Sequence, residues 1–173
     1  INITEYEEIE LTDQHHFEGE ITHRYCTEGL VKYDAFDEPK LRKTLDAFGD
    51  SLIIAQGKDR FRVHVHTNTP ELVFEKLKDY GTIETQKIDD MMMEMKLKNS
   101  DEKRVLVTDS IADLDSDFLD QNHIVVIPIN ITLDNVPYLD KLSINNKLLF
   151  GNLDSYLEYP KTATPSIKYI NDL

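Results

Sequence analysis

The sequence has little of what would point to an exported or membrane-embedded protein. It contains a single cysteine and no tryptophan among its 173 residues, so no disulfide can form within the chain. No signal peptide is visible, and no apolar run approaches the roughly 18 residues of a membrane span. A cytoplasmic location is therefore expected, without a transmembrane segment.

Positive charge is also scarce. Lysine and arginine number 19 against 33 aspartates and glutamates, which gives a formal net charge of −14 at pH 7. Such a chain repels phosphate backbones and anionic lipid, so nucleic-acid binding is not expected. A hydrophobic fraction of 40% fits one or two small globular domains at this length. The chain starts at Ile1 and stops at Leu173 just after a Pro-Ser turn, and we interpret it as a piece of a longer protein.

Residues 1–22 are expected to form an acidic linker or arm. They contain seven acidic side chains and neither lysine nor arginine. We interpret His15 and His16 in this arm as incidental rather than as metal ligands.

The spacing of apolar residues over 23–95 predicts a small domain of strands and helices. Four stretches with strand patterning predict strands, and two stretches with apolar residues three to four positions apart predict helices. The second helix is expected to begin at Pro70, with Thr69 as its N-cap. The resulting β-α-β-β-α-β order predicts an α+β, ferredoxin-like domain. The predicted strands cover 24–33, 52–55, 61–67 and 83–88, and the predicted helices cover 39–48 and 70–80.

Cys26 and the two histidines of Val63-His64-Val65-His66 form the candidate metal site. A strand sends alternate side chains to the same face, so His64 and His66 point the same way. In the ferredoxin-like order the first and third strands are neighbours, and Cys26 is expected beside the histidines on the face that the helices leave open. Thiolate sulfur and imidazole nitrogen favour zinc, and three ligands leave a fourth position open.

Glu28 follows Cys26 by two residues and shares its face of the strand. It is a candidate fourth ligand, a carboxylate that orients a ligand, or a general base, and equally an ordinary exposed glutamate. The cysteine and the histidines also have a plain interpretation, as three polar side chains on a solvated sheet surface.

A polar linker is expected over residues 96–103, followed by a partial α/β domain over 104–173. Its first strand, 105–107, is apolar throughout, as in a buried parallel sheet. Asp109 and Ser110 follow at the carboxyl end of this strand, where such sheets bind ligands, although both residues also suit helix capping. The remaining predictions are a helix over 115–121, a strand over 124–131, helical structure through Tyr156, and a packing role within the core or between domains for Met91, Met92, Met93 and Met95.

Three motifs in order resemble a known family: Arg24-Tyr25-Cys26-Thr27-Glu28, Phe48-Gly49-Asp50-Ser51-Leu52 and Val63-His64-Val65-His66-Thr67-Asn68. They are similar to the middle domain of the A subunit of fatty acid kinase, in a family also described as DAK phosphatase or dihydroxyacetone kinase-like. The resemblance covers roughly residues 18–95 and implies that the cysteine and both histidines form the family's metal site. Arg24 departs from the glycine usual in that family.

The second part of the chain resembles the opening of DegV-family proteins, through Val107-Thr108-Asp109-Ser110-Ile111-Ala112-Asp113-Leu114 and Pro160-Lys161-Thr162-Ala163-Thr164-Pro165-Ser166. Those proteins bind a fatty acid and present its carboxylate for phosphorylation. Thr162 matches the threonine of the family's Thr-Ser-Gln-Pro loop, near the acyl carboxylate, and joins Asp109 and Ser110 as a candidate acyl-binding residue. Its alternative is an ordinary hydroxyl in a turn bounded by proline. The departures from the family pattern are Ala163, Thr164 and Lys141.

Three functions are compatible with these features. The one we favour is a non-catalytic, metal-carrying module of a bacterial fatty acid kinase-like protein, fused to a fatty-acid-binding DegV domain and forming a homo-oligomer. Its ATP-binding kinase domain would lie upstream or in a separate chain, and the lobe that completes the acyl pocket is missing from this sequence. The second is a zinc-dependent hydrolase or phosphatase, since zinc lowers the pKa of bound water to about 7. The third is a regulatory or dimerisation module that binds no metal.

Overall fold

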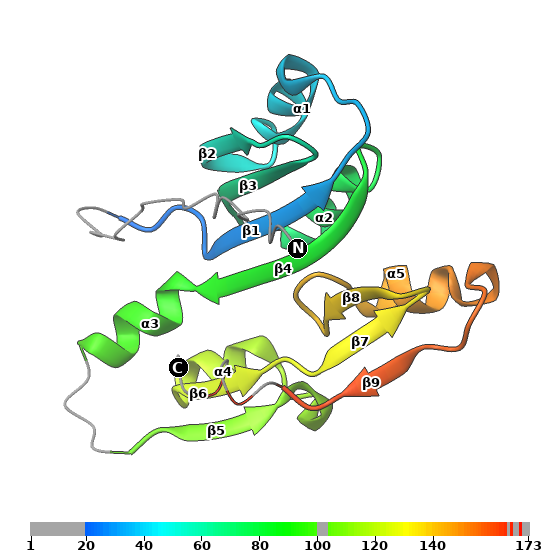
Figure 1. The fold of residues 1–173 in the computed structure, drawn as a ribbon. Helices are drawn as coiled ribbons and strands as arrows, with labels where there is room; N and C mark the ends of the chain where they lie inside the picture. The colour runs from blue at the N-terminus through cyan, green and yellow to red at the C-terminus, as the bar shows by residue number, and fades with distance from the viewer. Residues whose placement is uncertain (1–19, 100–103, 166, 168–169, 171–173) are drawn as a thin grey trace, which may run out of the picture.

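The computed structural model describes residues 20–99, 104–165, 167 and 170. Most of the expected acidic arm, with His15 and His16, lies outside the described residues. The chain forms two parts that follow one another along the sequence and pack together (Figure 1). Among the described residues, no helix combines the length and the hydrophobicity needed to cross a bilayer.

The first part is an α+β unit with the expected element order. Its four strands form one antiparallel sheet in the order β2-β3-β1-β4, so β1 and β3 are neighbours in the middle of the sheet. Helices α1 and α2 cover the same face of this sheet (Figure 1). The elements are β1 (Tyr25–Lys32), α1 (Glu38–Leu45), β2 (Gly49–Gln56), β3 (Arg60–Thr67), α2 (Pro70–Leu77) and β4 (Thr82–Asp90).

Both helices begin where the sequence places a proline in the first turn. Asp37 caps α1 by accepting a hydrogen bond from the Lys40 amide at 3.1 Å. Thr69 occupies the N-cap position of α2 as expected, but its side chain makes no capping hydrogen bond. Its amide instead donates to the hydroxyl of Thr67 at 3.0 Å. The position of the N-cap of α2 is therefore confirmed, but the Thr69 side chain does not make the capping hydrogen bond expected of an N-cap threonine.

The hydrophobic core lies between the helices and one face of the sheet. Phe61, Val63 and Val65 of β3 are fully buried there, so the residues between them in sequence face the other side. The alternation that sequence analysis assigned to this strand is confirmed. The buried residues of this core are Val31, Leu41, Leu45, Phe61, Val63, Val65, Val73, Phe74, Leu77, Ile83 and Ile88.

Helix α3 (Met91–Lys98) follows β4 directly and extends into the segment expected to be a linker. Its N-cap is Asp90, whose carboxylate accepts a hydrogen bond from the Met93 amide at 3.0 Å. Met91 and Met93 are buried, whereas Met95 is exposed. Residues 96–98 are thus helical. The sequence predicts a linker here because Lys96, Lys98 and the polar residues that follow form no helical pattern.

The second part combines a parallel strand pair with a three-stranded antiparallel sheet. Strands β5 and β6 are parallel, and β7 pairs with both β8 and β9 in the order β8-β7-β9. The elements are β5 (Leu106–Asp109), η1 (Ser110–Ala112), α4 (Ser116–Gln121), β6 (Ile124–Ile127), β7 (Asn130–Leu133), β8 (Val136–Leu139), α5 (Asn146–Gly151), η2 (Leu153–Ser155) and β9 (Lys161–Ala163).

Three expectations for this part are wrong. The single strand predicted over 124–131 is two strands, because Pro128 falls between β6 and β7 and proline cannot donate to a ladder. The helical prediction through Tyr156 missed strand β8 and holds only for α5. The first strand is not buried, because β5 pairs with β6 alone within the described residues. Val105, Leu106 and Val107 are 46%, 64% and 49% exposed.

Polar and apolar contacts join the two parts. Strand β4 contacts β8, and the Gln86 amide nitrogen donates to the carbonyl oxygen of Pro137 at 2.6 Å. Leu139 and Leu142 of the second part pack against the core of the first. Arg24 forms ion pairs with Asp90 of its own part and Asp120 in α4.

Candidate metal centre

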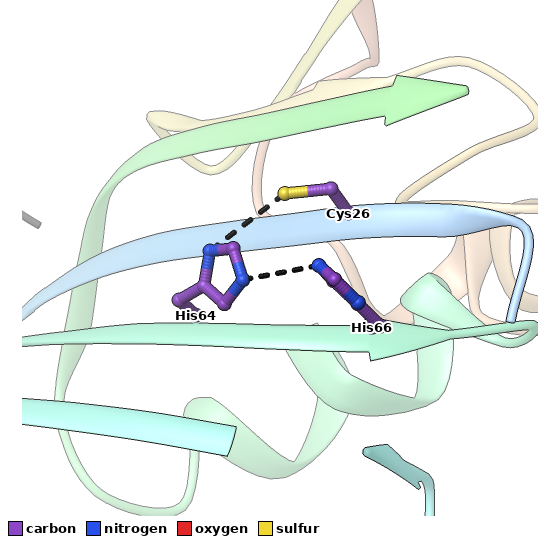
Figure 2. Close-up of side chains that lie close together, drawn as sticks. All are labelled: Cys26, His64 and His66. Atoms are coloured by element: carbon purple, nitrogen blue, oxygen red, sulfur yellow. Dashed lines mark hydrogen bonds between the residues drawn. The ribbon is translucent and has the colours of Figure 1, made fainter. Parts of the chain in front are cut away.

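The pairing of β1 with β3 brings the cysteine to the histidines. Cys26 lies opposite His66, and Glu28 lies opposite His64, in the antiparallel register. All four side chains extend from the sheet face opposite the helices, as the alternation predicts. Figure 2 shows the thiol of Cys26 and the two imidazole rings turned toward one another from neighbouring strands. The three side chains therefore converge in the structure, as the sequence predicts.

The distances within this group suit a single metal ion. The Sγ atom of Cys26 lies 3.7 Å from Nδ1 of His64, whereas the other ring nitrogen of His64, Nε2, lies 3.2 Å from Nε2 of His66, so only one of these two contacts can join a pair of ligand atoms. The three residues each offer one ligand atom, and these atoms all lie within 4.8 Å of one another. Tetrahedral zinc with bonds of about 2.0–2.3 Å holds its ligands about 3.3–3.8 Å apart. The residues present therefore fit such an ion with small side-chain movements.

The site lies on the sheet face that helices α1 and α2 leave open, but two of its three side chains are buried. Cys26 is 1% exposed and His64 is 0% exposed, and only the His66 side chain, at 18%, reaches the surface. Buried polar groups of this kind require compensating partners. The interpretation of these residues as polar side chains on a wet sheet surface is therefore excluded for Cys26 and His64.

Burial sets the protonation of the thiol. Loss of hydration, together with the nearby carboxylates of Asp89 and Glu28, raises the pKa of Cys26 to about 12, while Lys87 acts in the opposite direction. A thiol with so high a pKa is a poor nucleophile at neutral pH. A divalent cation would displace its proton and bind the thiolate, which is the form that zinc takes.

Two carboxylates lie beside the histidine rings. Oε1 of Glu28 is 3.6 Å from Nδ1 of His64, and Oδ1 of Asp50 is 3.6 Å from Nδ1 of His66. The interaction with His64 lowers the pKa of Glu28, against the effect of its partial burial. Glu28 was singled out from the sequence. Asp50 was not, although it belongs to the Gly49-Asp50-Ser51 stretch that carried the family resemblance.

The three candidate acyl-binding residues lie in the second part of the chain. The Asp109 carboxylate accepts a hydrogen bond from the Ile111 amide at 3.0 Å and thereby caps η1. Ser110 is buried, and its hydroxyl accepts a hydrogen bond from the Ile129 amide at 3.1 Å. Thr162 is exposed on β9, opposite Ile131 of β7. Ser110 thus contacts the segment that joins β6 to β7. Thr162 lies on the strand that pairs with β7.

Each of the two parts of the chain matches a known protein family. Residues 22–98 match the family model for the middle domain of fatty acid kinase A-like proteins, and residues 103–173 match that of the DegV family. The chain joins a fatty acid kinase A-like middle domain to a DegV-family domain. The fused architecture expected from the sequence motifs is confirmed.

Curated relatives of this chain occur in Staphylococcus aureus. Uncharacterised proteins of strains USA300, N315 and Mu50 are each 36% identical over 88 residues. The matched region is 46% of this chain and 16% of each relative. The chain thus covers about one sixth of the length of these curated relatives.

Proposed function

We propose that this chain is a non-catalytic, metal-carrying module of a bacterial fatty acid kinase-like protein, fused to an acyl-binding DegV domain. Cys26, His64 and His66 would hold one zinc ion that fixes the middle of the sheet. The DegV part would present the carboxylate of a fatty acid to an ATP-binding kinase domain. Phosphoryl transfer would take place in that kinase domain and not in this chain.

One observation carries the metal assignment: a thiol and two imidazoles converge within 4.8 Å in a domain of the fatty acid kinase A-like family. Soft sulfur and borderline nitrogen are the donors that zinc prefers over magnesium or calcium. Bound there, zinc would supply cross-links between β1 and β3. Such a site contributes directly to folding free energy.

The burial of the site favours this role over hydrolysis. A hydrolytic zinc needs an open coordination position that substrate can reach. Cys26 and His64 are 1% and 0% exposed, so two of the three ligand positions face packed protein. We therefore place the zinc-dependent hydrolase second.

For the acyl group, we propose contacts from Thr162, Asp109 and Ser110. Thr162 is exposed, whereas the buried Ser110 would act by shaping the β6–β7 connection. The expected partners are a long-chain fatty acid, a kinase domain and a second copy of the chain. The single thiol, which leaves no disulfide possible within the chain, favours the cytoplasm.

We also assign the first part to the ferredoxin-like architecture, with a domain over 23–95, a linker over 96–103 that begins with the last residues of α3, and a partial DegV-like domain over 104–173. The β-α-β-β-α-β order and the sheet order β2-β3-β1-β4 support this assignment.

Metal analysis of the purified 173-residue chain tests the proposal. The wild type should carry one zinc per chain, and Cys26→Ser, His64→Asn and His66→Asn should each bring the zinc content close to zero, because two remaining ligands hold zinc weakly. His123→Asn is the matched control, because this residue lies in the second part, on the turn before β6. A wild-type chain without stoichiometric metal would contradict the proposal. Cys26-dependent hydrolysis of phosphate or acyl esters would favour the hydrolase instead.

A further inference from the structure

We infer that Asp50 is a positioning residue of the metal centre: it holds the His66 ring so that Nε2 faces the metal. This role rests on the metal site proposed above. It adds a residue outside the three candidate ligands and defines which nitrogen of His66 binds.

Each histidine ring has a carboxylate near its Nδ1 atom and the other histidine near its Nε2 atom. Their Nε2 atoms face one another at 3.2 Å, and the Nδ1 atom of each lies 3.6 Å from a carboxylate oxygen, from Glu28 in one case and Asp50 in the other. A distance of 3.6 Å is an ion-pair contact that a small rotation of the ring shortens to a hydrogen bond. The His66 ring is therefore placed with Nδ1 toward Asp50 and Nε2 toward His64, whereas Nδ1 of His64 lies near both Glu28 and the sulfur of Cys26.

This arrangement orients the His66 ring. A carboxylate beside Nδ1 favours a proton on that nitrogen, which leaves the lone pair on Nε2. The Nε2 atoms of the two rings lie at hydrogen-bond distance, 3.2 Å apart. That separation is close to the roughly 3.3 Å expected for two nitrogens bound to one tetrahedral zinc at about 2.0 Å.

Asp50 is itself held in place by residues that precede β1. Its Oδ2 atom accepts hydrogen bonds from the Thr22 hydroxyl at 3.1 Å and from Nδ1 of His23 at 2.8 Å. These partners occupy one carboxylate oxygen, and Oδ1 is the oxygen that faces His66. The two oxygens of Asp50 thus have separate partners, as a carboxylate that fixes a ring requires.

The backbone of β2 explains why this aspartate can reach the site. Asp50 lies opposite His66 in the pairing of β2 with β3, and the register shifts between Asp50 and Ile53. Ser51, within this bulge, has a φ of 55°. A bulge breaks the strict alternation of a strand and turns a side chain in a new direction. Here it directs the Asp50 carboxylate toward the ring of its neighbour.

Zinc affinity and ring protonation together test this role. Asp50→Asn keeps the shape of the side chain and removes its charge, and it should weaken zinc binding by about 10–100-fold in a chelator competition. Glu28→Gln should weaken zinc binding to a similar extent. Asp59→Asn is the matched control, since Asp59 is paired with Arg60 in the turn between β2 and β3, and its affinity should equal that of the wild type.

The second readout is the ¹⁵N spectrum of the histidine side chains in the zinc-loaded wild type. The His66 ring should show a metal-bound Nε2 and a protonated Nδ1, and Asp50→Asn should shift the Nδ1 resonance of His66 more than that of His64. Equal zinc affinity of Asp50→Asn and wild type, or zinc bound to Nδ1 of His66, would overturn the role of Asp50 and leave the metal site standing. A wild type that binds no zinc would overturn both.

Discussion

At Gly49, β2 lies very close to the backbone of β3 beside the candidate metal centre. A Cβ atom placed on Gly49 would lie 1.8 Å from the carbonyl oxygen of His66, a distance that no real contact allows. Because the clash is with backbone, no side-chain rotation relieves it. The absence of a side chain at this position therefore sets how closely β2 approaches His66, and with it the reach of Asp50.

Gly49→Ala should therefore damage both stability and metal binding. We expect the free energy of unfolding to fall by about 1–3 kcal/mol, the usual cost of forcing extra atoms into packed structure. Zinc affinity should fall as well, because His66 must move. Thermal unfolding and chelator competition measure the two effects.

Gly151→Ala is the control for this change. Nothing lies within 4 Å of a Cβ atom at Gly151, which ends α5, so the substitution should leave zinc affinity unaltered and stability equal to or slightly above that of the wild type, because alanine favours a helix over glycine. A Gly49→Ala variant as stable as Gly151→Ala would show that β2 can shift at no cost.

At the residue level, the sequence predicted which three candidate metal ligands converge but not their surroundings. Alternation along β1 and β3 is a local rule, so it correctly placed Cys26, His64 and His66 on one face. The same rule could not place Asp50 on this face, because the bulge in β2 breaks the alternation. Burial of the candidate ligands could not be predicted from this rule either, since alternation assigns a face and says nothing about what covers that face.

At the level of elements, the β7–β8 hairpin has a tight connection. Leu133 pairs directly with Val136, so only Asp134 and Asn135 form the turn. Their φ angles are 46° and 67°, the left-handed pair of a type I′ turn. The Asp134 carboxylate also accepts hydrogen bonds from the amides of Leu157 and Glu158 at 2.9 and 3.0 Å.

Substitution at Asn135 should follow this backbone requirement. Asn135→Gly removes the cost of a left-handed residue and should leave the hairpin as stable or slightly more stable. Asn135→Ala should destabilise the chain by about 1 kcal/mol, because alanine tolerates this conformation less well than asparagine. Urea unfolding of both variants measures the difference. Equal stability of the two would contradict the assigned turn.

This hairpin also shows where sequence analysis failed at the element level. An Asp-Asn pair between two apolar runs favours a hairpin, but the interpretation of 132–156 as helical overrode it. Pro128 likewise breaks the apolar run 124–131, for which the sequence analysis predicts a single strand. In the first part, by contrast, proline and glycine coincided with the ends of regular patterns, so all six elements were predicted within a few residues.

At the level of the whole molecule, Arg24 links the two domains. Its guanidinium donates two hydrogen bonds to Asp90, at 2.9 and 2.6 Å, and two to Asp120 of α4, at 2.9 and 3.0 Å. Lys96 adds a longer ion pair with Asp120 at 3.5 Å. A planar fork that pairs with two carboxylates at once is a contact that lysine cannot reproduce.

Arg24→Gln should loosen the two domains, because it leaves both carboxylates without their main partner. We expect a loss of about 1–3 kcal/mol, the range for hydrogen bonds to charged groups, and unfolding that separates into two transitions. Burial opposes ionisation of Asp120, but the hydrogen bonds and charge of Arg24 outweigh it and lower its pKa. The stabilisation is therefore complete above about pH 3.9, the pKa of aspartate in an unfolded chain. It disappears as the pH falls through the lower pKa of the folded state.

Urea unfolding of wild type and Arg24→Gln between pH 6 and about pH 2.5 checks this dependence. The difference between the two should shrink at the acidic end. Arg42→Gln is the matched control, because its ion pair with Glu38 lies within α1 and should be worth about 0.3–0.5 kcal/mol.

Contacts of this kind could not be predicted from the sequence. Arg24 and Asp120 belong to different domains, and no local pattern states which surfaces of two domains meet. In the sequence, Arg24 stands out only as a departure from the glycine usual at its position in the family. The structure gives that departure a physical role, since glycine there could not bridge to α4.

Cys26 also lies where chemical reagents cannot easily reach it. Its strand is bonded to a neighbour on both edges, β3 on one side and β4 on the other, and its thiol is almost wholly inaccessible. An alkylating reagent can attack the sulfur only after the sheet has opened. Because the chain has no other sulfhydryl, labelling of the metal-free chain would report on that opening at one known position, and the native sequence already carries a specific reporter of local unfolding.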